Sequence, residues 1–152
     1  MAIEVKVLQR GDDPILMHVA AEVFDKPVDV GLTREFLEDP RHHIAVAIDD
    51  GLVVGFASGV HYIHPDKPAE LWINEVAVAP THRRRGLGKA VVRALLEVGR
   101  AHQCKAAWVL TDRSHVAAMA LYSSVGGTEG ADLRGPTQAT LGYWFALAEP
   151  LS

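Results

Sequence analysis

The residues best suited to chemistry lie in one basic, glycine-containing segment near the middle of the chain. Three consecutive arginines at 83–85 precede Gly86 and Gly88, and an apolar, strand-like run at 75–80 comes directly before them. An amphipathic pattern then predicts a helix over 85–102. The first N–H groups of a helix have no partner within the helix, and they bind anions readily. The segment therefore predicts a phosphate-binding turn at a helix start.

Three kinds of phosphate-binding motif can be compared with this turn. A Walker A loop requires glycine where Arg83 stands, and Ser or Thr where Ala90 follows Lys89. A dinucleotide fingerprint requires a third glycine where Val91 stands. Neither nucleotide motif fits. The pattern that does fit is Arg/Gln-x-x-Gly-x-Gly/Ala at 83–88, directly after the apolar run.

A second motif lies on the next predicted helix. Ala118, Leu121-Tyr122 and Gly126 follow the first motif at a distance that leaves room for a helix and a strand. With both motifs in this order, the sequence resembles the GNAT N-acetyltransferase superfamily, in detail over about residues 45–127. It resembles type I aminoglycoside 3-N-acetyltransferases more loosely.

The resemblance implies acetyl-CoA as co-substrate. In the family the turn binds the pyrophosphate, and the pantetheine arm pairs with the strand before the turn, which splays from the following strand. Here 106–110 is the expected splayed neighbour. His115 stands where the family often has an asparagine that contacts the arm, and histidine can also donate one bond and accept one. The expected coenzyme-binding residues are Val76, Ala77, Val78, Arg83, Arg84, Arg85, Gly86, Leu87, Gly88, Lys89, His115 and Tyr122.

Acetyl transfer by direct attack in a ternary complex needs a neutral amine. An alkylammonium with a pKa of about 10 is only about one part in a thousand neutral at pH 7, so a nearby base is useful. Glu75, within an apolar run, is the expected base, or else it holds a cationic substrate. Strand alternation predicts that Asn74 and Glu75 face opposite sides of the sheet. The resemblance implies that Tyr122 is the acid that protonates the leaving thiolate.

The acceptor is predicted less sharply than the donor. Several acidic residues favour a small cationic amine, such as an aminoglycoside or another amino sugar. A peptide or protein amine is an alternative, and so is a non-catalytic acyl-CoA-binding module. The residues expected to bind the acceptor are Phe24, Asp25, Tyr62, Trp72 and Glu75.

Composition limits the other functions. The 152 residues predict a single domain over 1–152, and the net charge of −4 disfavours nucleic-acid or membrane binding. A single cysteine, Cys104, and no signal-like segment favour a cytoplasmic protein. Dimers are common among similar proteins, which makes a homodimer compatible with the resemblance. No metal is expected, because His61 and His64 would lie on opposite faces of a strand.

The spacing of apolar residues predicts a β-α-α-β-β-β-α-β-α-β order. We expect an α/β (α+β) protein with one mixed, mostly antiparallel sheet flanked by helices, the GNAT fold. The first two helices are expected from the Asp12 cap to about Phe24, and over 33–38 with Thr33 as the cap. The last predicted helix covers 116–125 and the last strand 143–147.

Overall fold

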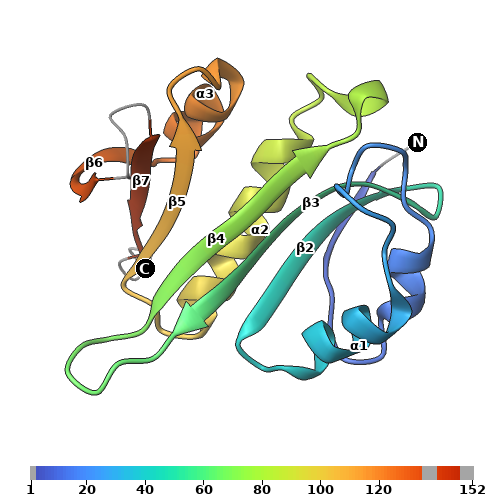
Figure 1. Ribbon diagram of the computed structural model, residues 1–152, viewed down its shortest axis with the longest axis horizontal. Coiled ribbons are helices and arrows are strands. Elements are labelled where there is room, and N and C mark those ends of the chain that lie inside the picture. Colours follow the sequence, from blue (N-terminus) through green and yellow to red (C-terminus); the bar gives the residue numbers. More distant parts are fainter. Residues whose placement is uncertain (1–2, 135–139, 148–152) are drawn as a thin grey trace.

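The computed structural model describes residues 3–134 and 140–147. Seven strands form one sheet in the order β1-β2-β3-β4-β5-β7-β6, and every neighbouring pair is antiparallel except the parallel pair β4–β5 (Figure 1). The predicted single mixed sheet with flanking helices is confirmed. The strands are β1 (Glu4–Val7), β2 (His42–Asp49), β3 (Leu52–Tyr62), β4 (Glu70–Val78), β5 (Ala106–Asp112), β6 (Thr128–Arg134) and β7 (Thr140–Ala146).

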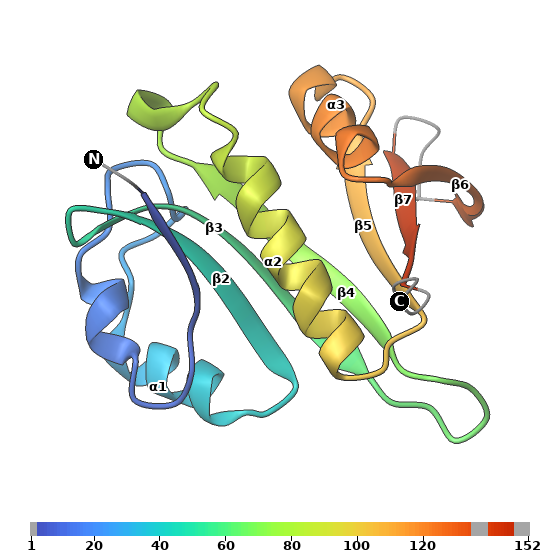
Figure 2. The same cartoon turned by 180° about the vertical axis from the view of Figure 1, so that it is seen from behind.

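Helices cover both faces of the sheet. Helix α2 (Leu87–Ala101) crosses one face over β2, β3 and β4, and α3 (Val116–Ser124) packs beside it (Figure 2). The 3-10 helix η1 (Asp13–Met17) and α1 (Val30–Glu38) lie against the opposite face, and a second 3-10 turn, η2 (Pro80–His82), follows β4. No helix in the described part of the chain is both long and apolar enough to cross a membrane.

The main core lies between α2 and the sheet. Val91, Val92 and Leu95 of α2 are fully buried, as are Leu71 and Ile73 of β4. Apolar side chains at a spacing of three and four residues form one helical stripe, and its burial holds α2 on the sheet. This stripe positions the start of α2 beside the end of β4, where the glycine turn lies.

The N-terminal segment differs from the predicted long helix. Only Asp13–Met17 is helical, because the backbone of His18 and Ala20 pairs instead with Val53 of β3. Val53 N–H donates to the His18 carbonyl at 2.8 Å, and Ala20 N–H donates to the Val53 carbonyl at 2.9 Å. Pairing with a strand therefore takes the place of further helical turns, and residues up to Phe24 follow an irregular path.

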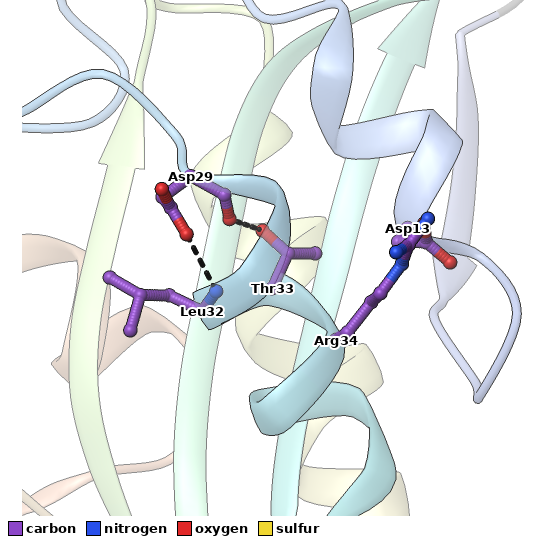
Figure 3. A network of polar contacts seen from close by, with 5 residues as sticks. All are labelled: Asp13, Asp29, Leu32, Thr33 and Arg34. Carbon is purple, nitrogen blue, oxygen red and sulfur yellow. Dashed lines mark hydrogen bonds and ion pairs between the residues drawn. The ribbon is translucent and has the colours of Figure 1, made fainter.

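Helix α1 begins earlier than predicted. Asp29 caps it in place of Thr33, because the Asp29 carboxylate accepts a bond from Leu32 N–H at 2.8 Å (Figure 3). Thr33 lies inside the helix and its hydroxyl donates to the Asp29 carbonyl at 2.8 Å. An ion pair of 3.1 Å between Arg34 and Asp13 ties α1 to η1.

One further strand and two further boundaries differ from the prediction. The strand β6 was not predicted at all, and β7 begins at Thr140 rather than at Tyr143. Helix α2 begins at Leu87 rather than Arg85, because Arg84 and Gly86 have φ values of +64° and +76°, which no helix accommodates.

Candidate active site

The glycine turn presents free backbone donors at the start of α2. The first intrahelical bond runs from Ala90 N–H to the Gly86 carbonyl at 3.0 Å, which leaves the N–H groups of Leu87, Gly88 and Lys89 without a helical partner. Arg83, Arg84 and Arg85 are exposed, and none of them forms an ion pair with a residue that the structure describes. The turn therefore combines unpaired N–H groups, a helix dipole and unneutralised charge, which together favour an anion.

Glycine is needed at positions 86 and 88 of the turn for two different structural reasons. Gly86 has φ +76°, and a Cβ atom there would meet no heavy atom within 4 Å. Glycine is favoured at position 86 because the backbone there is left-handed, and not because a side chain would lack space. At Gly88 a Cβ atom would lie 3.3 Å from Leu121 Cδ2 of α3. Gly88 therefore permits close packing of α2 against α3, a reason that the sequence did not reveal.

One side chain missed by sequence reasoning anchors the turn. His82 Nε2 lies 2.7 Å from Asp49 Oδ2, and His82 Nδ1 lies 2.8 Å from Thr81 Oγ1. Asp49 ends β2, so these bonds fix the segment after β4 to the β2–β3 hairpin. Contacts 33 residues apart in sequence leave no local signal, and no motif pointed to His82.

Strands β4 and β5 diverge toward the turn. Their parallel pairing runs only from Glu70–Ala106 to Ile73–Val109, and Figure 1 shows the two strands separating beyond it. On this side the backbone of Val76, Ala77 and Val78 has no strand partner among the described residues. The predicted divergence of the two strands is present. In β5, residues 106–109 remain paired with β4, and only residues 110–112 are separated from it.

A bulge in β4 determines where Glu75 points. Ser58 pairs with Glu75 but Gly59 pairs with Ile73, so Asn74 is an additional residue in β4. The bulge reverses the alternation, which places Ile73 on the α2 face and Glu75 with Ser58 on the other face. The prediction that Asn74 and Glu75 simply alternate is wrong, because the bulge lies between Ile73 and Glu75.

Glu75 reaches a cavity beneath the N-terminal segment. The cavity has a volume of about 450 Å³, in the range of small-molecule sites. Phe24 stacks on Phe56 of β3 with ring centroids 4.2 Å apart. Asp25, Asp29 and Glu75 bring three exposed carboxylates to the wall, and Lys26 brings one ammonium group. The lining residues are Leu16, Phe24, Asp25, Lys26, Pro27, Val28, Asp29, Leu32, Thr33, Phe36, Ile44, Phe56, Ser58 and Glu75.

Two residues predicted to bind the acceptor do not line this cavity. Tyr62 is 48% exposed at the far end of β3, where it pairs with Glu70. Trp72 pairs with Trp108 of β5, on the part of the sheet that α1 does not cover. Tyr62 and Trp72 are therefore not part of this cavity, because both lie beyond the bulge from the turn.

Helix α3 lies across the diverging strands from the turn (Figures 1 and 2). Tyr122 lies within this helix, and His115 directly precedes it. The Tyr122 ring packs on Tyr143 and Phe145 of β7, with centroid distances of 5.7 and 6.4 Å. Burial raises the pKa of the Tyr122 hydroxyl above its usual value, so the group is protonated at neutral pH. His115 is exposed at the cap position of α3, and its side chain makes no capping bond.

A separate group of histidines lies on the α2 face. His43, His61 and His102 bring one ring nitrogen each within 4.8 Å of one another. The sequence analysis considered His61 only with His64, and it missed this group because the three residues lie on three different elements.

The comparisons with known proteins fit this geometry. The model of the acetyltransferase (GNAT) family matches residues 14–126, which include the turn, Glu75 and Tyr122. The chain belongs to this family. As a GNAT N-acetyltransferase it depends on acetyl-CoA, so the predicted enzyme class and co-substrate are confirmed.

Two curated relatives act on different acceptors. The N-alpha-acetyltransferase RimI of Mycobacterium tuberculosis is 30% identical over 126 residues, or 82% of this chain and 77% of that protein. The L-2,4-diaminobutyric acid acetyltransferase of Nocardia farcinica is 35% identical over 88 residues, or 58% of this chain. The match spans only 45% of the length of the Nocardia protein.

Solved structures share the fold at lower identity. The yncA protein of Salmonella typhimurium, solved with its cofactor acetyl-CoA, has a TM-score of 0.71 at 20% identity, with 100% of this chain and 98% of that chain covered. An aminoglycoside acetyltransferase from an uncultured soil metagenomic sample, in complex with sisomicin, has a TM-score of 0.73 at 17% identity, covering 89% and 94%. Identities this low show a common fold only.

Proposed function

We propose that this N-acetyltransferase acetylates a primary amine of a small, cationic acceptor bound in the cavity beside Glu75. The observation that carries the proposal is the Glu75 carboxylate, which the bulge turns into the cavity wall close to where β4 leaves β5. A cavity of about 450 Å³ suits a small molecule, and Asp25 and Asp29 add two further carboxylates against the single cation Lys26, so the wall attracts a cation.

Acetyl-CoA binding follows from the turn and the splay. The diphosphate oxygens accept bonds from N–H groups between Arg84 and Lys89, and the helix dipole and the exposed arginines add favourable charge. The pantetheine amides pair with the free backbone of Val76 and Val78. This route leads the thioester toward the point where β4 and β5 separate, between Glu75 and α3.

The chemistry then needs one base and one acid. Glu75, directly or through a water, takes a proton from the acceptor ammonium, and the neutral nitrogen attacks the thioester carbonyl carbon. The attacking nitrogen is cationic in the tetrahedral intermediate and loses its second proton to solvent, and the intermediate then collapses as its C–S bond breaks. The Tyr122 hydroxyl gives its proton to the departing thiolate, whose basicity is comparable to that of a phenolate. Solvent later returns a proton to Tyr122 and removes one from Glu75. The base and acid roles of these two residues, and the coenzyme contact of His115, are part of this proposal.

A second candidate acceptor is the N-terminal amine of a protein. The similarity to RimI supports it, because that match covers 82% of this chain. The relative that acetylates diaminobutyrate supports a small acceptor instead. A peptide backbone would have to enter the same cavity, where Phe24, Phe36 and Phe56 offer apolar contacts.

The test is a thiol-release assay with acetyl-CoA and four acceptor classes: diamino acids, aminoglycosides, polyamines and short peptides. We expect turnover with at least one small cationic class, and a loss of about 10²-fold or more in kcat for Glu75→Gln. Glu38→Gln is the matched control, because Glu38 is an exposed glutamate of α1 that does not line the cavity.

The outcomes separate the alternatives. Turnover with peptides alone would replace the proposed acceptor with a protein amine. Coenzyme binding without turnover in any class would indicate an acyl-CoA-binding module. Equal kcat for Glu75→Gln and Glu38→Gln would remove Glu75 from the mechanism.

A further inference from the structure

Three histidines from three different elements meet on the α2 face of the sheet. His43 of β2 and His61 of β3 lie close to His102, which follows the last residue of α2. His43 Nε2 and His61 Nδ1 are 2.8 Å apart, and the three rings have centroid separations of 4.6 to 5.1 Å. We call His43, His61 and His102 the histidine cluster.

The cluster is separate from the proposed active site. His43 pairs with Gly59, where a Cβ atom would lie 3.4 Å from Leu95 of α2, so the cluster is on the α2 face. The acceptor cavity lies on the opposite face, beside Ile44 and Ser58. The glycine turn is at the other end of α2, about 20 Å away for a 15-residue helix. No step of acetyl transfer uses these rings.

Burial favours the neutral form of two of the three imidazoles, those of His43 and His61. Burial, with a smaller contribution from the neighbouring histidines, lowers the pKa of His43 to about 4, and burial likewise lowers the pKa of His61. Arg41 adds positive charge near His61, whereas Asp39 partly offsets it and forms an ion pair with Arg41 at 3.7 Å. Neutral imidazole is the form that ligates metal ions.

We infer that the histidine cluster binds one divalent transition-metal ion of the zinc class. Three imidazole nitrogens and a water make a tetrahedral site of the N₃O type, with Zn–N bonds of about 2.0–2.1 Å and N···N separations of about 3.3 Å. His43 Nε2 and His61 Nδ1 are 2.8 Å apart, and the three ligand atoms all lie within 4.8 Å of one another, so adjustments of about 1 Å suffice to reach this value. The ring that donates the His43–His61 hydrogen bond transfers that proton to its other nitrogen, by way of solvent. Small rotations of the rings then bring three lone pairs onto one point, and two metal bonds replace the hydrogen bond.

Two features of the position favour a cation. His102 lies at the C-terminal end of α2, where the helix dipole is negative and stabilises positive charge. His43 is 9% exposed whereas His102 is exposed, so an ion reaches the site from solvent and still has a buried ligand. A bound ion joins the end of α2 to β2 and β3, and we assign it a structural role.

The test measures Zn²⁺ binding to the full chain after treatment with a chelator. We expect one equivalent to bind in a competition titration against a chromophoric chelator, and the melting temperature to rise with Zn²⁺ concentration. Co²⁺ in place of Zn²⁺ should give the intense visible absorption of a tetrahedral site. His61→Gln and His102→Gln should each weaken Zn²⁺ affinity about tenfold or more, because removal of a ligand costs at least as much as loss of an outer-shell partner.

His42→Gln is the matched control. His42 neighbours His43 in β2, but its ring lies beside Phe36 with a centroid distance of 5.3 Å, outside the cluster. We expect this variant to retain wild-type Zn²⁺ affinity and melting behaviour. The proposal is overturned if the wild-type chain shows no stoichiometric binding, or if the two cluster variants bind Zn²⁺ as tightly as His42→Gln does. Neither result bears on acetyl transfer, which is assayed separately.

Discussion

Replacement of Gly86 by alanine separates backbone strain from coenzyme binding. Gly86 has φ +76°, and an L-residue in the left-handed region costs about 1–2 kcal/mol. The added Cβ meets no heavy atom within 4 Å, so no steric cost adds to this value in the free protein. For a chain of this size we expect the melting temperature to fall by about 2–8 °C.

The same methyl group should weaken acetyl-CoA binding, because it enters the open space where the diphosphate is proposed to lie. Loss of one charge-assisted hydrogen bond costs about 1.5–3 kcal/mol, which corresponds to a rise in Kd of about 10- to 150-fold. Isothermal titration with acetyl-CoA measures this change directly. Gly86→Ala should fold and melt cooperatively, so weak binding cannot be attributed to unfolding.

Gly11→Ala is the matched control for strain. Gly11 has φ +94°, and a Cβ atom there also meets nothing within 4 Å, but the residue lies in the segment between β1 and η1. We expect a similar loss of stability and an unchanged Kd for acetyl-CoA. If Gly86→Ala loses stability as expected but binds acetyl-CoA within twofold of the wild type, the diphosphate does not lie at this turn and the reasoning is refuted.

Three further predictions concern Tyr122, Gly59 and Cys104. Tyr122→Phe should lower kcat about 10²-fold with little change in the Kd for acetyl-CoA, and an unchanged kcat would exclude Tyr122 as the acid. Because the pKa of Tyr122 is raised, ionisation of this residue should cause no loss of wild-type kcat below about pH 10. Gly59→Ala puts a Cβ atom 2.5 Å from the Trp72 carbonyl oxygen, so urea denaturation should show a loss of about 2–4 kcal/mol, and a loss under 0.5 kcal/mol would contradict the packing. Cys104 is 1% exposed, and burial raises the pKa of its thiol. A disulfide reagent should therefore modify Cys104 far more slowly than a free thiol until denaturant is added. Rapid modification of the native chain would show that Cys104 is not buried.

The sequence predicted the glycine turn and α2 better than it predicted the cavity beside Glu75. The turn at 83–88 and the stripe on α2 are local patterns, and their spacing follows directly from helix geometry. Most of the sheet was predicted for the same reason, since apolar alternation marks a strand without knowledge of its partners. The start of α2 was missed by two residues, because no sequence rule marks Arg84 as left-handed.

Long-range contacts account for what the sequence did not reveal. The segment after η1 pairs with Val53 of β3, which overrides the helix-start signal at Asp12. The bulge at Asn74 depends on the pairing register between β3 and β4, and this register determines the face of the sheet on which Glu75 lies. The His82–Asp49 contact and the histidine cluster likewise join residues from different elements. Neither composition nor spacing contains such information.

The central claim is that backbone donors of the turn at 84–89 bind the diphosphate of acetyl-CoA. A crystal structure of the chain with bound acetyl-CoA is the most direct test. The account predicts diphosphate oxygens within hydrogen-bond distance of these N–H groups, with the pantetheine arm along Val76 and Val78 and the thioester between Glu75 and Tyr122. A coenzyme bound elsewhere, with no N–H of the turn in contact with phosphate, would contradict it.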